Sequence, residues 1–96
     1  MIKNSQLGNG ALVFQESQNV LINHVTITEI GNIPGINIMN QSTVTADDLT
    51  IHDLQNTLIA IHDESKSTIR NSNFHHSEAN GFYLAEQSSI EIINCT

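Results

Sequence analysis

The sequence has few of the residues that brace small domains or hold them in a membrane. Its 96 residues include one cysteine, Cys95, one proline and no tryptophan. A single cysteine cannot form a disulfide within the chain, so the redox compartment stays open. Apolar residues never continue for the roughly 18 positions that a membrane-spanning helix needs. No signal peptide is visible at the start, and the sequence leaves the cellular compartment open.

Basic residues are scarce as well. Three Lys and Arg stand against ten Asp and Glu, which gives a net charge of −7 at pH 7. A chain this acidic repels the phosphates of nucleic acids and the headgroups of anionic lipids, so we expect neither nucleic acid nor membrane as a partner. Acidic polysaccharides are disfavoured for the same reason, unless calcium bridges the charges. The polar residues that abound instead are Asn, Ser, Thr, Gln and His.

A repeat runs through the whole chain. Its copies read apolar, any residue, Asn/Asp/His, small or apolar, polar, apolar, and they begin at Ile2, Ile22, Ala46, Ile69 and Ile92. A second motif, a turn residue followed by apolar, any and apolar residues, runs in phase and begins at Gly10, Gly35, Thr57 and Gly81. The residues before it, Asn9, Pro34, Asn56 and Asn80, favour turns.

The apolar residues of these copies alternate with period two over short stretches, as in Val25 and Ile27 or Phe82 and Leu84. Alternation of this kind, in short segments rich in β-branched residues, predicts strands and not helices. A strand of one copy buries its apolar side by stacking on the next copy, about 4.8 Å away. The sequence therefore predicts a parallel solenoid in which each coil contacts only its neighbours.

One turn position is occupied by Asn4, His24, Asp48, Asn71 and Asn94. Asparagine tolerates left-handed backbone angles, and its amide can bond to the copies above and below. We interpret this column as a structural ladder, and the alternative is a ligand site built from His24 and Asp48.

The frame from Ser88 to Cys95, with Ile92 and Asn94 at its centre, resembles the right-handed parallel β-helix repeat of the pectate-lyase-like superfamily, and so does the segment 79–84. The resemblance implies an all-β, right-handed parallel β-helix of about four coils of 22–24 residues, with three short strands per coil and one domain over residues 1–96. The superfamily contains lyases, hydrolases and epimerases together with adhesins, tailspikes and non-catalytic repeat domains. Its fold alone does not choose among these functions.

The repeat register predicts an exposed column on one strand of each coil, formed by Leu12, Asn37, Ile59 and Tyr83. Three of these residues are apolar, so we expect either cover by a partner or a ligand-binding surface on which Tyr83 stacks against carbohydrate or protein. The same register predicts that Ile38, Ala60 and Leu84 point inward. Ala60→Asp should then unfold the chain, because it would bury an unpaired charge.

His52 and His75 are the candidate metal ligands, since the repeat places them on adjacent coils. The alternative is a pair of solvated histidines, because a flat sheet holds such side chains parallel. We identify no catalytic residue and no cofactor. Asp47 and Arg70 face outward on adjacent coils, where we expect an ion pair.

These observations favour a non-catalytic β-helix domain that serves as a rigid scaffold or binding surface within a larger protein. The alternatives are part of a carbohydrate-active enzyme, such as a lyase, epimerase or hydrolase, and a glycan-binding adhesin. Expected partners are other segments of the same protein or a protein partner, with carbohydrate as a further candidate. Neither end carries a recognisable cap, so we also expect a fragment of a longer solenoid, or end-to-end association into an oligomer.

Overall fold

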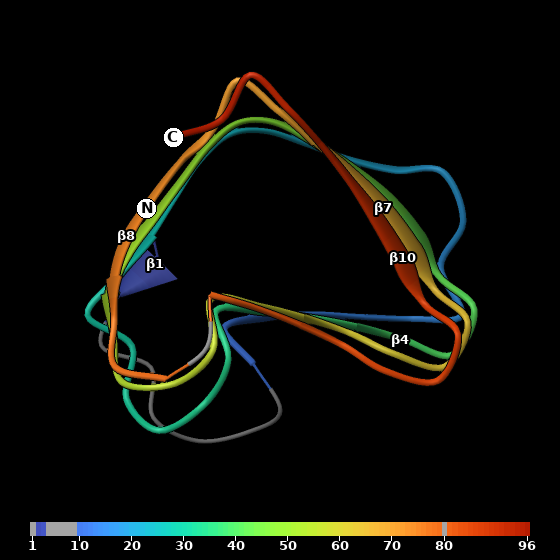
Figure 1. Cartoon of the computed structure of the whole chain (residues 1–96), viewed down its shortest axis with the longest axis horizontal. Coiled ribbons are helices and arrows are strands. Elements are labelled where there is room, and N and C mark those ends of the chain that lie inside the picture. Colours follow the sequence, from blue (N-terminus) through green and yellow to red (C-terminus); the bar gives the residue numbers. More distant parts are fainter. Residues whose placement is uncertain (1, 4–9, 80) are drawn as a thin grey trace.

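The computed structural model describes residues 2–3, 10–79 and 81–96, and all regular structure in them is β-strand. Three of the predicted turn residues, Asn4, Asn9 and Asn80, lie outside these ranges. The strands pair in parallel and form a solenoid with a triangular outline (Figure 1). This confirms the predicted parallel β-helix. The part of the chain in these ranges has no helix of the length and hydrophobicity needed to cross a bilayer.

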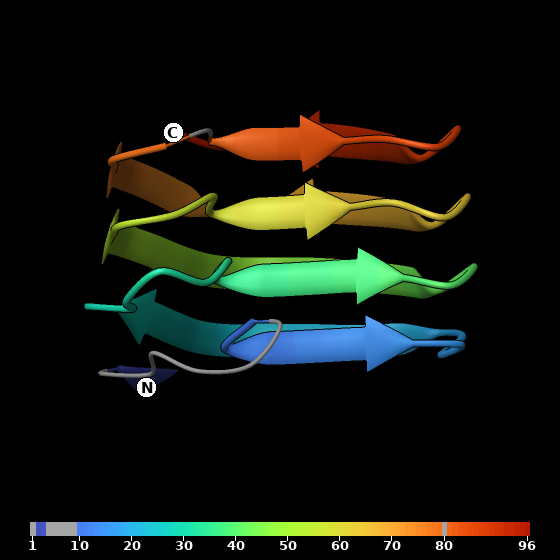
Figure 2. The ribbon, with the colours of Figure 1, turned by 90° about the horizontal axis from the view of Figure 1, so that it is seen from below.

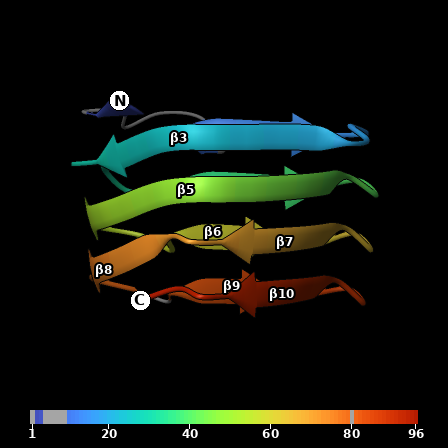
Figure 3. The same ribbon diagram turned by 90° about the horizontal axis from the view of Figure 1, so that it is seen from above.

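Two parallel sheets make up the solenoid. The first, here called the bent sheet, contains β1 (Ile2–Lys3), β3 (Val20–Thr28), β5 (Thr43–Leu54), β7 (Lys66–Arg70) and β10 (Ser89–Ile93) in that order, with β8 (Asn73–Ser77) also paired to β5. The second, the flat sheet, contains β2 (Leu12–Gln15), β4 (Ile36–Met39), β6 (Ile59–Ile61) and β9 (Phe82–Leu84) in that order. Its four strands lie one above another, one from each coil (Figures 2 and 3).

The bent sheet covers two of the three sides because the chain turns at one repeated position. His24, Asp48, Asn71 and Asn94 occupy this position, and all have positive φ, between 52° and 60°. Strands β3 and β5 continue through the turn, whereas β7 and β8 are separate strands on either side of Asn71 and Ser72. Two of the three strands predicted for each coil are therefore a single bent strand in β3 and β5.

Strand pairing in the bent sheet follows the predicted register. Asn23, Asp47, Arg70 and Ile93 form one column, and Thr28, His52 and His75 form another. Because the side-chain period of a strand is two, this register also places Ile22, Ala46 and Ile69 on the inward side, where all three are buried.

The predicted register of the flat sheet is wrong in two of its four coils. Leu12 pairs with Ile36, Ile36 with Ile59, and Ile59 with Phe82, in one inward column. The outward column is Val13, Asn37, Ala60 and Tyr83. Leu12 packs against the core and Ile59 is only 1% exposed, so neither lies on the predicted surface. Ala60 was predicted to point inward, but it belongs to the outward column. Ile61 occupies the inward position instead.

The core is a narrow column of isoleucine, leucine and valine that runs the length of the solenoid. Ile27, Leu49, Ile51, Leu54 and Ile61 are completely buried. Each such side chain stabilises the fold by about 1.5–3 kcal/mol relative to an exposed one. The last coil is the exception, because its inward residues Leu84 and Ile92 remain 40% and 45% exposed.

Candidate functional site

The outer face of the flat sheet carries a shallow recess. Tyr83 is 49% exposed at the end of the outward column, and the small side chain of Ala60 separates it from Asn37. The recess is lined by Pro34, Asn37, Asn56, Thr57, Ala60, His62, Tyr83 and Glu86. Two of the predicted ligand-binding residues, Asn37 and Tyr83, are therefore together on this face, whereas Leu12 and Ile59 are inside.

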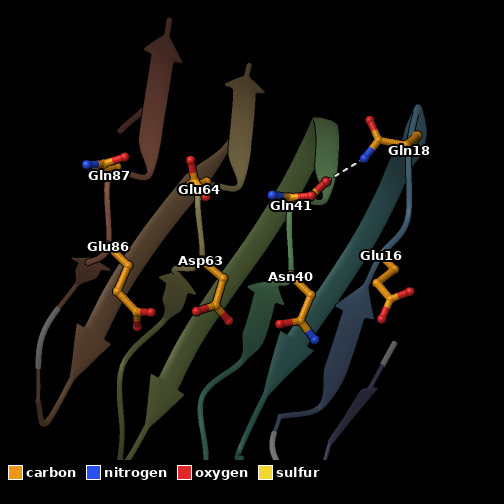
Figure 4. Close-up of a pocket in the computed structure, with 8 residues that line it drawn as sticks. All are labelled: Glu16, Gln18, Asn40, Gln41, Asp63, Glu64, Glu86 and Gln87. Atoms are coloured by element: carbon orange, nitrogen blue, oxygen red, sulfur yellow. Dashed lines mark hydrogen bonds between the residues drawn. The ribbon is translucent and has the colours of Figure 1, made fainter.

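A corner rich in carboxylates adjoins the recess where the flat sheet turns toward the bent sheet. Its residues, here called the acidic corner, are Glu16, Gln18, Asn40, Gln41, Asp63, Glu64, Glu86 and Gln87 (Figure 4). The turn repeats in three coils as a pair of residues with positive φ, namely Asn40–Gln41, Asp63–Glu64 and Glu86–Gln87. Backbone bonds of 2.9 Å from Gln41 N to Asp63 O and from Glu64 N to Glu86 O stack these turns. The side chains of Asn40, Asp63 and Glu86 consequently form a row along the solenoid axis.

His62 connects the recess to the acidic corner. Its Nε2 lies 2.7 Å from Asn37 Oδ1, and its Nδ1 lies 3.5 Å from Asp63 Oδ2 and 3.9 Å from Glu86 Oε1. A hydrogen bond with Asp63 and the negative charge of that carboxylate raise the pKa of Glu86. His62, Asp63 and Glu86 each offer one possible ligand atom, and these atoms lie within 4.8 Å of one another. The residues of the recess and corner therefore offer hydrogen bonds, a stacking ring and metal ligands.

The candidate metal ligands His52 and His75 lie on adjacent coils, as the register predicts. Their rings stack with centroids 4.8 Å apart and an interplanar angle of 13°. His52 Nδ1 lies 2.7 Å from Asp53 Oδ2, and this hydrogen bond lowers the pKa of Asp53. His75 Nδ1 lies 2.6 Å from His76 Nδ1. In the described ranges, neither His52 nor His75 belongs to a group of three converging ligands, and a metal site there stays a prediction.

The turn column of the bent sheet links coils through its side chains. His24 Nδ1 lies 2.6 Å from Asp48 Oδ2, and Asn94 Nδ2 donates to Asn71 Oδ1 at 2.7 Å. Both His24 and Asp48 are largely exposed, with no third ligand near them in the described ranges.

The expected ion pair between Asp47 and Arg70 does not form among the described residues, although the two are register partners. Asp47 Oδ1 accepts a hydrogen bond from Asn71 Nδ2 at 3.1 Å instead.

Sequence reasoning missed the grouping of His62, Asp63 and Glu86. The signal was present as a spacing of 23 residues, because Asn40, Asp63 and Glu86 occupy the same place in consecutive coils. Sequence motifs built from adjacent residues do not reveal such a column, which exists only after the chain has coiled.

Comparison with known proteins supports the architecture. Neither the curated proteins nor the solved structures include a significant match to the chain. A family model described as a right handed beta helix region matches residues 1–96, which is the whole chain. The match agrees with the stacked parallel coils, and the chain belongs to the right-handed β-helix family.

Proposed function

We propose that the chain is a rigid β-helix module, without catalytic activity, whose flat-sheet face binds carbohydrate. Tyr83 carries this proposal, since it presents an exposed aromatic ring on a strand whose backbone is fixed by pairing to β6. The face of an aromatic ring is electron-rich and binds the polarised C–H groups of a sugar ring. Binding sites commonly combine such a surface with a few polar groups that fix orientation.

Hydrogen-bonding groups surround the tyrosine in the recess. Asn56, Asn37 and His62 supply amide and imidazole groups, and Glu86 supplies a carboxylate at the edge. With a net charge of −7, the chain favours a neutral glycan over an acidic one. A neutral oligosaccharide therefore fits both the chemistry of the recess and the charge of the molecule.

The spacing of the acids supports binding and not hydrolysis. Glycoside hydrolases hold their two carboxyl groups about 5–9.5 Å apart, so that a sugar or a water fits between them. Asp63 and Glu86 have carboxylate oxygens within 4.8 Å of each other. This separation is shorter than that of a hydrolase pair, and it supports binding rather than hydrolysis by these two residues.

We also propose that the chain is a non-catalytic member of the pectate-lyase-like β-helices, with its turn column acting as a structural ladder. Two side-chain bonds between coils, from Asn94 to Asn71 and between His24 and Asp48, support the ladder. A rigid column of coils suits a scaffold because each coil fixes the position of the next.

A glycan array tests this function with the purified chain, Tyr83→Ala and the matched control Leu21→Ala, which removes an exposed apolar side chain from the bent sheet. We expect Tyr83→Ala to weaken binding to neutral glycans by roughly tenfold, because stacking is lost. Leu21→Ala should bind like the parent chain. Unchanged binding by Tyr83→Ala would refute the proposal, and release of reducing sugar from a bound glycan would establish an enzyme instead.

A further inference from the structure

We propose that His62, Asp63 and Glu86 form a binding site for a divalent transition-metal ion such as Zn²⁺, and this proposal does not depend on glycan binding although His62 and Glu86 also line the recess. The three residues come from the turns of two adjacent coils, with His62 and Asp63 after β6 and Glu86 after β9. The site couples the third coil to the fourth, whose inward side chains Leu84 and Ile92 are poorly covered. A bound ion would thus hold the last coil in place.

The hydrogen bond to Asn37 fixes the tautomer of neutral His62 that can bind a metal through Nδ1. Asn37 Oδ1 can only accept, so the proton of neutral His62 resides on Nε2, at 2.7 Å from that oxygen. The lone pair is then on Nδ1, which is the atom that points toward Asp63 and Glu86. Metal-binding histidines almost always donate their other ring N–H to such an acceptor, which fixes both the tautomer and the ring orientation.

The distances within the group suit ligands better than hydrogen-bond partners. Ligand atoms about 2.0–2.2 Å from a tetrahedral Zn²⁺ lie about 3.4 Å from each other. His62 Nδ1 is 3.5 Å from Asp63 Oδ2 and 3.9 Å from Glu86 Oε1. By contrast, the Nδ1–Oδ2 distance is 2.6 Å between His24 and Asp48 and 2.7 Å between His52 and Asp53. The histidine–carboxylate distances of His62 are therefore longer than those of these two pairs. The side chain of Glu86 is 62% exposed and is therefore free to move toward an ion.

Charge and ligand type define the ion. Asp63 and Glu86 are adjacent carboxylates, which repel each other when both are ionised. A divalent cation removes the repulsion. An imidazole nitrogen favours zinc and similar transition metals, whereas Ca²⁺ and Mg²⁺ prefer sites made only of oxygen. Three protein ligands leave the fourth position of a tetrahedral site open to water.

Isothermal titration calorimetry of the untagged chain with ZnCl₂ tests the proposal. The variants are His62→Gln, Glu86→Gln and Asp63→Asn, since asparagine also tolerates the positive φ at position 63. We expect binding of one Zn²⁺ per chain, weakened at least tenfold by each variant. Replacing Asn37 by Leu should also weaken binding by roughly 10–100-fold, because the orienting hydrogen bond is lost.

Glu64→Gln is the matched control, since it removes a carboxylate of the acidic corner that lies outside the three-residue group, and glutamine already occupies this turn position in the neighbouring coils at Gln41 and Gln87. We expect it to bind Zn²⁺ like the parent chain, and CaCl₂ to bind the parent chain more weakly than ZnCl₂. The proposal is overturned if the parent chain binds no Zn²⁺ at 1 mM, if His62→Gln binds as well as the parent, or if Glu64→Gln loses as much affinity as His62→Gln. Circular dichroism establishes that each variant is folded, and no glycan is involved in any of these outcomes.

Discussion

At the scale of single residues, the corners of the solenoid depend on side chains that accept a left-handed backbone. Fifteen non-glycine residues of the described ranges have positive φ, and most of them recur at the same place in successive coils. For an L-amino acid this conformation costs about 1–2 kcal/mol, which Asn and Asp reduce through local hydrogen bonds. At the turn column of the bent sheet, which holds Asp48, Asn71 and Asn94, this relief explains the residue type.

Asn71 provides a test of this interpretation. Its φ is 52°, and its Oδ1 accepts a hydrogen bond from Asn94. Asn71→Ala should lower the free energy of unfolding by about 1–2 kcal/mol, because alanine tolerates positive φ poorly. Asn71→Gly loses the same hydrogen bond without the backbone cost, so urea unfolding should find it more stable than the alanine variant. Equal stability of the two variants would show that backbone strain is unimportant here.

Asp53 makes stability depend on pH in the acid range. The hydrogen bond from His52, with smaller contributions from the nearby His76 and His75, lowers the pKa of Asp53 in the folded chain. A lowered pKa stabilises the fold above the unfolded value of about 3.9, and this contribution is lost as pH falls through the folded value. Asp53→Asn should therefore lose less stability than the parent chain as the pH falls from 5 through the folded pKa of Asp53. Thermal unfolding across that range would contradict the assignment if both chains lost stability in parallel.

At the scale of elements, the sequence predicted one sheet better than the other. In the bent sheet, a polar turn residue such as Asp48 or Asn71 marks the same point of every coil and fixes the register. The flat sheet has no such mark in two coils, where residues 11–14 and 58–61 are four consecutive apolar residues. Alternation cannot define the inward side of an uninterrupted apolar run, and a slip of one residue exchanges inside for outside.

The same one-residue register error affects the predicted ligand-binding residues. Asn37 and Tyr83 come from coils where polar and apolar residues alternate, and they lie on the outer face as predicted. Leu12 and Ile59 come from the uninterrupted runs and lie on the inner face. Leu58 takes the place that a glycine occupies in the next coil at Gly81, so a search for turn residues misplaces the start of β6 by one position.

A pair of charge substitutions distinguishes the two registers. Ile61 is completely buried, so Ile61→Asp should unfold the chain by placing an unpaired carboxylate in the core. Ala60 is 7% exposed, but it lies in the outward column and lines the recess, so Ala60→Asp should destabilise the chain much less than Ile61→Asp. Circular dichroism and urea unfolding measure both. Unfolding by Ala60→Asp together with a stable Ile61→Asp would restore the register predicted from sequence.

At the scale of the whole molecule, the end of the solenoid formed by β9 and β10 leaves apolar side chains uncovered. Leu84 and Ile92 continue inward columns whose preceding members, Ile61 and Ile69, are almost fully buried. The open edges of β9 and β10 also present backbone groups for pairing. We propose that a second copy of the chain covers this end when the chain is studied by itself, and the alternative is cover by a further coil of a longer solenoid.

Self-association should then depend on the last coil. Sedimentation velocity should show dimers of the parent chain at high concentration, and Ile92→Lys should shift the chain to monomer by placing a charge on the covered surface. Arg70→Ala, on the outside of the bent sheet, is the control and should not change the equilibrium. A parent chain that stays monomeric at all concentrations contradicts this association.

The most direct test of the proposed carbohydrate-binding face is an NMR titration of the ¹⁵N-labelled chain with a neutral oligosaccharide identified on the array. We predict that chemical-shift changes concentrate on Asn37, Ala60, His62 and Tyr83, which line the recess. Residues of the bent sheet such as Asp47 and Arg70, on other sides of the triangle, should be unaffected. Changes centred on the bent sheet, or none at millimolar glycan, would contradict the assignment of the flat sheet as the binding face.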